Sequence, residues 1–232
     1  MRKLAAFAGL AALASVLGAE AAQAHPSRII LLRHGEKKNS AELCDVGKLR
    51  AQALSDQYLG KGAPGNEIIF GKGGKPDAFF AVTAHTKETA MPSAETWGKQ
   101  VTAFWVPPKD PNEDADLDTQ TQKAAAELNS ADYDGKTVVI VWEHNRIAKK
   151  DLNSTFWTLL RLGDIDAPDS WKGVNYDFFW IIDYTTSQPS FTVVQQQYTG
   201  AAGAKVPDNL WGVDVDRNKF PDFYADCKNK DD

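Results

Sequence analysis

The hydrophobic positions of this chain gather into short runs that alternate with polar segments. Residues 27–32 (Ser-Arg-Ile-Ile-Leu-Leu), 78–83 (Ala-Phe-Phe-Ala-Val-Thr) and 136–142 (Lys-Thr-Val-Val-Ile-Val-Trp) are each dominated by an unbroken apolar stretch. An unbroken stretch of this length, bounded by polar residues, is typical of a strand that is buried on both faces. Residues 101–106 predict a further strand.

Stretches of helical character separate these strands. We expect one helix to begin at Asp45 and others to cover about Thr86–Lys99, Thr119–Leu128 and Ile147–Leu162. Two segments rich in Gly, Pro and charge, Gly60–Pro76 and Pro107–Asp118, predict surface loops. The first of these loops has room for a short strand at Glu67–Phe70.

Two late runs complete the pattern. Residues Tyr176–Thr185 and Phe191–Gln197 are aromatic and β-branched, and the turn Ser187-Gln188-Pro189 between them predicts a hairpin. The tail from Lys205 is polar and irregular. Alternation of strands and helices predicts an α/β fold, a three-layer α/β/α sandwich with a mainly parallel central sheet and a C-terminal antiparallel hairpin. We expect residues 25–232 to form one domain.

The first 24 residues have the organisation of a secretory signal peptide. Arg2 and Lys3 give a positive start, Leu4–Gly18 is apolar and rich in alanine, and Ala22-Gln23-Ala24 is a small-x-small cleavage site. The apolar run is too short and wrongly flanked for a spanning helix. We therefore expect cleavage before His25, no membrane insertion of the remaining chain, and export to the periplasm or outside the cell.

Charge and cysteine content bear on partners and compartment. The formal net charge is −5 and there is no basic run, which argues against nucleic acid as the main partner. A local cationic pocket can still bind a small phosphate. The two cysteines, Cys44 and Cys227, are an even pair, so in an oxidising compartment we expect a disulfide. The alternative is two unpaired thiols.

Three of the four histidines directly follow predicted strands, namely His34, His85 and His144. Ligands of open α/β sheets gather at the carboxyl ends of the strands. These histidines could hold zinc, or one of them could attack a phosphate whose oxygens are held by cations. Arg33 favours phosphoryl transfer, because its planar guanidinium suits phosphate and a cation beside a metal ligand is unfavourable.

A known family shares these features. The run Ile29–Glu36, which ends in Arg-His-Gly-Glu, resembles the signature of the histidine phosphatase superfamily, the phosphoglycerate-mutase-like group. Residues Leu43–Ala53 are similar to the helix start that follows it in that family, and Val138–His144 resembles the strand that delivers a second histidine. The resemblance spans about Ile29 to Ala148.

The resemblance implies roles for individual residues. His34 would be the nucleophile and Arg33 would hold the phosphoryl group. His144 would donate to the same oxygens, and Gly35 would let the backbone turn beside the phosphate. The reaction implied is hydrolysis of a small phosphomonoester, with no cofactor and no metal.

Two departures from the family pattern leave questions open. His85 stands where the family has a second arginine, so His85 itself, Arg50, Arg146 or Lys87 could supply the missing charge. An imidazole at this position would bind the phosphate less strongly than a guanidinium, which donates two hydrogen bonds at once.

The second departure concerns the proton donor. Asn145 follows His144 where one branch of the family has an aspartate that protonates the leaving group. Glu88 and Glu143 are the candidates for that role, and Glu143 could equally orient His144 or pair with Arg33. An alternative hypothesis is therefore a weak or inactive relative that only binds a phosphorylated ligand or anion. The sequence indicates neither substrate nor oligomeric state.

Overall fold

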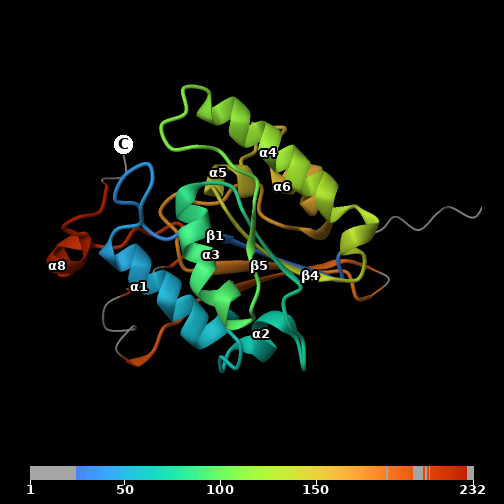
Figure 1. Cartoon of the computed structure of the whole chain (residues 1–232), viewed down its shortest axis with the longest axis horizontal. Coiled ribbons are helices and arrows are strands. Elements are labelled where there is room, and N and C mark those ends of the chain that lie inside the picture. The colour runs from blue at the N-terminus through green and yellow to red at the C-terminus, as the bar shows by residue number, and fades with distance from the viewer. Residues whose placement is uncertain (1–24, 187, 201–205, 207, 209, 229–232) are drawn as a thin grey trace, which may run out of the picture.

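A six-stranded mixed sheet forms the centre of the molecule (Figure 1). The computed structural model describes residues 25–186, 188–200, 206, 208 and 210–228, so the expected signal peptide lies outside the described residues. The strands lie in the order β3-β2-β4-β1-β5-β6. Their bounds are β1 Arg28–Arg33, β2 Ala78–Ala81, β3 Val101–Ala103, β4 Thr137–Trp142, β5 Phe178–Asp183 and β6 Ser190–Gln195.

The direction of the strands confirms the expected topology. Strand β1 pairs in parallel with β4, which pairs in parallel with β2, and β2 with β3. Strand β5 is antiparallel to both β1 and β6, which makes the late pair a C-terminal hairpin. Ser187, in the expected turn, lies outside the described residues. The carboxyl ends of β1, β2 and β4 consequently meet at one edge of the sheet.

Helices cover both faces of the sheet (Figure 1). Helices α1, α2 and α3 pack with one hydrophobic cluster, and α4, α5 and α6 pack with the other. Their bounds are α1 Asp45–Leu54, α2 Asn66–Phe70, α3 Ala84–Thr96, α4 Glu113–Leu128, α5 His144–Ile147 and α6 Phe156–Leu159. A π-helical turn, Ser55–Leu59, continues α1, and short 3₁₀ turns lie at Ala131–Tyr133 and Leu162–Ile165.

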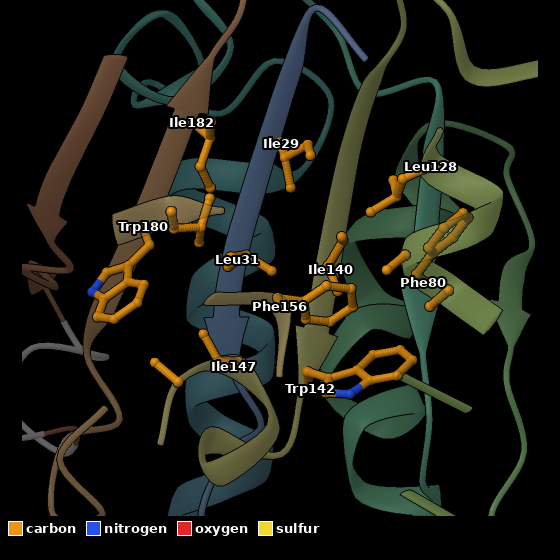
Figure 2. Close-up of a cluster of buried hydrophobic side chains, with 14 of the residues drawn as sticks. Ile29, Leu31, Phe80, Leu128, Ile140, Trp142, Ile147, Phe156, Trp180 and Ile182 are labelled. Carbon is orange, nitrogen blue, oxygen red and sulfur yellow. The ribbon is translucent and has the colours of Figure 1, made fainter. Parts of the chain in front are cut away.

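Alternation along β1 explains why the first apolar run has no polar face. Ile29 and Leu31 belong to the cluster under α4 and α6, where Figure 2 shows Leu31 beside Ile140 of β4. Ile30 and Leu32 belong to the cluster on the opposite face of the sheet. Burying such a side chain fully stabilises the fold by about 1.5–3 kcal/mol, so both faces hold β1 in the centre.

The expected long helix over Ile147–Leu162 is wrong. Helix α5 ends at Ile147 and Ala148 is extended; Lys149 then forms a bridge with Ser170, and the Trp171 amide donates to the Ala148 carbonyl. A new N-cap restarts the helix at α6, where the Thr155 side chain accepts from the Thr158 amide. Long-range pairing therefore replaces the middle of that helix.

Two further expectations need correction. Residues Glu67–Phe70 lie in helix α2 rather than in a strand; Ile69 and Phe70 pack into the same hydrophobic cluster, whereas neighbours in a strand point to opposite faces. The loop expected over Pro107–Asp118 ends early, since α4 begins at Glu113. Acidic residues in its first turn stabilise the positive end of the helix dipole.

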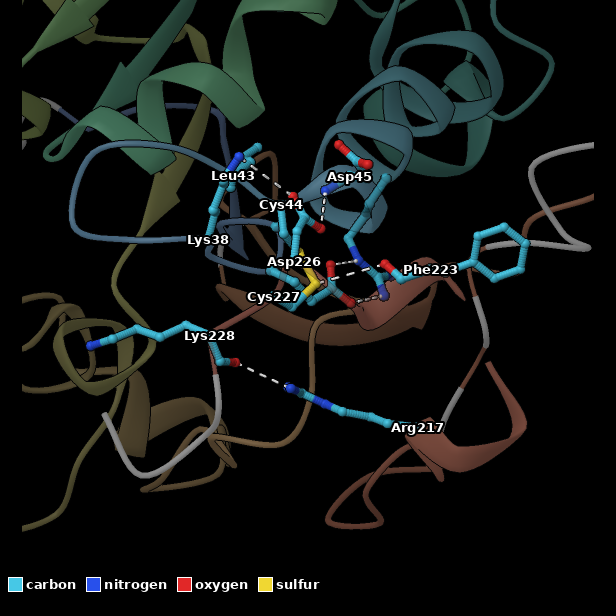
Figure 3. Close-up of a disulfide and its surroundings, with 12 residues drawn as sticks. Lys38, Leu43, Cys44, Asp45, Arg217, Phe223, Asp226, Cys227 and Lys228 are labelled. Atoms are coloured by element: carbon cyan, nitrogen blue, oxygen red, sulfur yellow. Dashed lines mark hydrogen bonds and ion pairs between the residues drawn. A yellow bond between two sulfur atoms is a disulfide. The ribbon is translucent and has the colours of Figure 1, made fainter. Parts of the chain in front are cut away.

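The tail contains more order than expected and is tied to the start of the chain. A 3₁₀ turn (Arg217–Lys219) and a short helix α8 (Pro221–Tyr224) precede Cys227. The expected disulfide joins Cys227 to Cys44 immediately before α1, as Figure 3 shows. The Asp45 amide also donates to the Asp226 carboxylate at 3.1 Å. Among the described residues, no helix is long and apolar enough to cross a membrane.

Candidate active site

Three strand ends bring the histidines together. His34 directly follows β1, His85 lies in the first turn of α3 after β2, and His144 begins α5 after β4. The His34 amide donates to the Trp142 carbonyl at 3.4 Å, which continues the β1–β4 ladder into the site. The ring centroids of His34 and His85 are 5.7 Å apart. Parallel pairing of neighbouring strands therefore positions the cluster.

The hydrogen bonds of His34 define its tautomer. Its Nδ1 lies 2.5 Å from the Gly35 carbonyl oxygen, which can only accept, so Nδ1 carries a proton. In the neutral ring the lone pair is then on Nε2. Nε2 lies 3.1 Å from a Glu143 carboxylate oxygen. The ring is fully buried, and burial lowers the pKa of His34 to about 4.

Glu143 connects most of the polar groups of the site. Its Oε2 contacts both His34 Nε2 and Lys37 Nζ at 3.1 Å, and its Oε1 accepts from the Thr83 hydroxyl at 2.9 Å. His85 Nδ1 lies 4.0 Å from Oε1. Burial opposes ionisation of this carboxyl, but the Lys37 ammonium lowers the pKa of Glu143. Glu143 is thus the anion around which the cluster is organised.

The other two histidines are also neutral near pH 7. Burial and the charge of Arg33 lower the pKa of His144 to about 2, and burial and Lys37 lower the pKa of His85. His85 Nε2 lies 2.7 Å from the Asn39 carbonyl, so its single N–H is committed there. His144 Nδ1 is buried and has no hydrogen-bond partner among the described residues.

Arg33 lies against the segment before β5. Its Nη1 donates to the Gly173 carbonyl, and its guanidinium carbon lies 3.8 Å from the centre of the Tyr176 ring. The buried Nε of Arg33 has no partner in the described part of the chain. A Cβ added to Gly173 would lie 3.2 Å from His144 Nε2. The segment from Gly173 to Tyr176 therefore packs over both proposed phosphate donors.

Two glycines allow the strand end and α1 to touch through their backbones. A Cβ on Gly35 would lie 2.8 Å from the Gly47 carbonyl oxygen, and a Cβ on Gly47 would lie 2.2 Å from the Glu36 carbonyl oxygen. The Gly35 amide donates to the Thr89 hydroxyl at 2.9 Å, which fixes the turn from α3. Both glycines of the sequence motif therefore serve the same close approach.

Arg50 lies in a buried ion pair with Glu36. Its Nε and Nη2 donate to the two carboxylate oxygens at 3.1 and 2.7 Å, and both residues are 1% exposed. Burial alone would raise the pKa of Glu36, but Arg50 holds it below the usual value. The Nη1 of Arg50 is buried and without a partner among the described residues. Contact of Arg50 with phosphate stays a prediction.

The remaining candidates lie outside the histidine cluster. Arg146 donates to Asp118 at 2.8 Å and to Asp114 at 2.9 Å, both on α4. Lys87 is exposed on α3. Glu88, one turn after His85, accepts from the Leu43 amide at 2.7 Å. The structure thus brings Glu143 beside His34 and leaves Glu88 holding the loop before α1.

Sequence reasoning missed three residues of this site. Lys37 and Thr83 both bind the Glu143 carboxylate, and Tyr176 stacks on Arg33. Lys37 had a recognisable signal, since it is a cation three residues after His34 at a strand end. Thr83 and Tyr176 had none, because their roles depend on contacts with residues distant in sequence.

Comparisons with known proteins find remote structural matches only. No family model and no curated protein matches the chain. A mycobacterial glucosyl-3-phosphoglycerate phosphatase has 14% identity and a TM-score of 0.41, with 75% of this chain and 100% of that chain covered. The complex of that phosphatase with VO3 has 14% identity and a TM-score of 0.39, with 72% of this chain and 97% of that chain covered. A putative phosphohistidine phosphatase from Agrobacterium tumefaciens has 12% identity and a TM-score of 0.40, with 73% of this chain and 97% of that chain covered. Function is therefore argued from the side chains of this chain.

Proposed function

We propose that this chain is a phosphomonoester hydrolase of the histidine phosphatase type, with His34 as the nucleophile. One observation carries the proposal: Nδ1 of the buried His34 ring is held by the Gly35 carbonyl, and this contact directs Nε2 toward Glu143 and Lys37. A neutral, oriented imidazole is what attack on phosphorus requires. The proposal assigns Arg33 and His144 to the oxygens of the phosphoryl group.

The reaction would proceed in two steps. In the first, a bond forms between Nε2 of His34 and phosphorus while the bond from phosphorus to the ester oxygen breaks. The electron pair of that bond leaves with the oxygen, which takes a proton and departs as an alcohol. The Gly35 carbonyl keeps its hydrogen bond to Nδ1 and stabilises the positive charge on the phosphorylated ring.

We assign the proton transfers to Glu143 rather than to Glu88, because Glu143 lies within hydrogen-bond distance of His34. A monoanionic phosphoester would give its proton to this carboxylate on entry, and Glu143 would pass it to the leaving oxygen. In the second step water attacks phosphorus, the bond to Nε2 breaks and its pair returns to the ring. Glu143 accepts the proton from water and returns it to the released phosphate.

The test compares His34→Ala with His25→Ala, a matched control that removes the histidine outside the cluster. Release of phosphate from an aryl phosphate should fall at least about 10³-fold in His34→Ala and stay unchanged in His25→Ala. Rapid quenching should trap an acid-labile phosphoryl label on the wild type and on His25→Ala, but not on His34→Ala. Full activity of His34→Ala would refute the proposal. Binding of inorganic phosphate without hydrolysis of any phosphoester in a panel would favour the binding-only alternative.

The same proposal includes an exported protein whose domain covers residues 25–232. The disulfide between Cys44 and Cys227 supports an oxidising compartment. Sequencing the N-terminus of the protein recovered from outside the cytoplasm should give His25 as the first residue. Recovery of an uncleaved chain would contradict this part of the proposal.

A further inference from the structure

We infer that Lys37 is the second cation of the phosphoryl site, in the role that the family pattern gives to a second arginine. The inference rests on the proposed function, since it assumes that a phosphoryl group enters beside His34. It starts from one shared atom: Oε2 of Glu143 lies 3.1 Å from the Lys37 ammonium and 3.1 Å from His34 Nε2. The ammonium is therefore held next to the nitrogen that would attack.

The other candidates for this charge are committed to other partners. Arg50 forms a bidentate pair with Glu36, and Arg146 is paired with α4. His85 is neutral near pH 7 because burial lowers its pKa, and its N–H is directed at the Asn39 carbonyl. Within the described residues, Arg33 and Lys37 are the cations whose charges act on His34.

Lys37 is also more exposed to solvent than the two groups that it adjoins. Its side chain is 25% exposed, whereas that of Glu143 is 7% exposed and that of His34 is fully buried. An anion approaching from solvent would meet this ammonium before it reached the imidazole. A lysine carries a compact point charge on a flexible stem, so it can leave a carboxylate for a phosphate without movement of the backbone.

The backbone of Lys37 is held in place by two separate contacts. It forms a bridge with Leu43, and its carbonyl accepts from the Lys228 amide at 2.7 Å. Lys228 follows Cys227, whose disulfide fixes this part of the tail to Cys44. The base of the lysine is therefore fixed while its end is free to exchange partners, which favours a preorganised cationic donor.

Exchange of partners would also prepare the proton donor. When phosphate takes the ammonium, Glu143 loses the Lys37 charge that lowers its pKa and gains a neighbouring anion. Both changes favour protonation of its carboxyl. Lys37 would thus hold the phosphoryl oxygens and switch Glu143 to the acid form in the same movement.

The test uses inorganic phosphate as the probe, because binding does not depend on turnover. Lys37→Ala should weaken phosphate binding about 10- to 100-fold in calorimetry near neutral pH. Lys37→Arg should retain most of the affinity. The matched control Lys87→Ala removes the same charge from the exposed face of α3 and should bind as the wild type does. Equal affinity in Lys37→Ala and the wild type would overturn the inference.

A double-mutant cycle with Glu143→Gln separates phosphate contact from a purely structural role. If Lys37 only neutralises Glu143, its removal should have no effect on phosphate binding in the Glu143→Gln background. If it binds phosphate, Lys37→Ala should still cost about 10- to 100-fold there. The proposed function fails separately, when the wild type binds phosphate and hydrolyses no phosphoester. Suppose instead that Lys37→Ala binds phosphate and hydrolyses phosphoesters as the wild type does, while His34→Ala is inactive. That result would refute the Lys37 inference and leave the proposed function standing.

Discussion

Replacement of Arg50 by methionine decides whether this arginine stabilises the fold or binds substrate. Methionine has a similar length and fills part of the volume, so the main loss is charge. The change removes two charge-assisted hydrogen bonds and leaves the Glu36 carboxylate buried without its partner. Removing one member of a buried ion pair costs about 3–5 kcal/mol of folding free energy. For a chain of this size, Tm should fall by about 6–20 °C.

The loss should depend on pH in a defined direction. In the wild type, Arg50 lowers the pKa of Glu36, so the pair stabilises the fold above the unfolded pKa and loses that contribution as pH falls. In Arg50→Met only burial remains as the major influence, and burial raises the pKa of the carboxyl. Burial of a protonated Glu36 costs less free energy than burial of its unpaired carboxylate. The difference in unfolding free energy between wild type and variant should therefore shrink from pH 7 to pH 5.

The assay combines urea unfolding with calorimetric phosphate titration of the folded protein. The double variant Arg50→Met/Glu36→Gln is the control, and it should be more stable than Arg50→Met because no charge is left unpaired. We expect the phosphate affinity of the folded single variant to stay within a few-fold of the wild type. An unchanged Tm with phosphate affinity lost would refute this reasoning and make Arg50 a ligand through its unpartnered Nη1.

Two other properties can be checked on the unmodified protein. The pKa values of His34 (about 4) and His144 (about 2) lie below that of an unfolded histidine, so the unfolded state binds more protons and stability should fall as pH drops below about 6.5. Urea unfolding should show a slope of about 1.4 kcal/mol per pH unit for each histidine, and a flat profile would contradict it. Reduction of the disulfide, which spans 183 residues, should cost up to about 5 kcal/mol and weaken phosphate binding. The Cys44→Ser/Cys227→Ser variant should start at that lower stability and not respond to reductant.

The sequence predicted the sheet better than the helices. Strands β1, β4 and β5 are buried on both faces, so their apolar runs are unbroken and their ends are sharp. The segment after β4 is different, because its local pattern suits a helix while the pairing of Lys149 with Ser170 breaks that helix. Pairing over this distance leaves no mark in the periodicity of either segment.

The positions of the candidate site residues could be predicted, but their partners could not. Strand ends are visible in the sequence, and they placed His34, His85 and His144 together. Which ions pair is decided by the packing of distant segments: Lys37 meets Glu143 across 106 residues of sequence, and Arg50 turns inward to Glu36. A pattern of charges along the chain contains no information on such choices.

The bond between the Lys228 amide and the Lys37 carbonyl sets an order of events during biosynthesis. The loop that contains Lys37 is translated early, but its contact with the tail can form only after residues 227 and 228 have been made, and the disulfide only after Cys227 has met an oxidant. A chain that is still being synthesised would have its three histidines at the strand ends but would lack the contact between Lys228 and Lys37. A chain kept in a reducing cell interior would lack the disulfide. If the chain hydrolyses phosphoesters as proposed, we expect it to spare those of the compartment in which it is made.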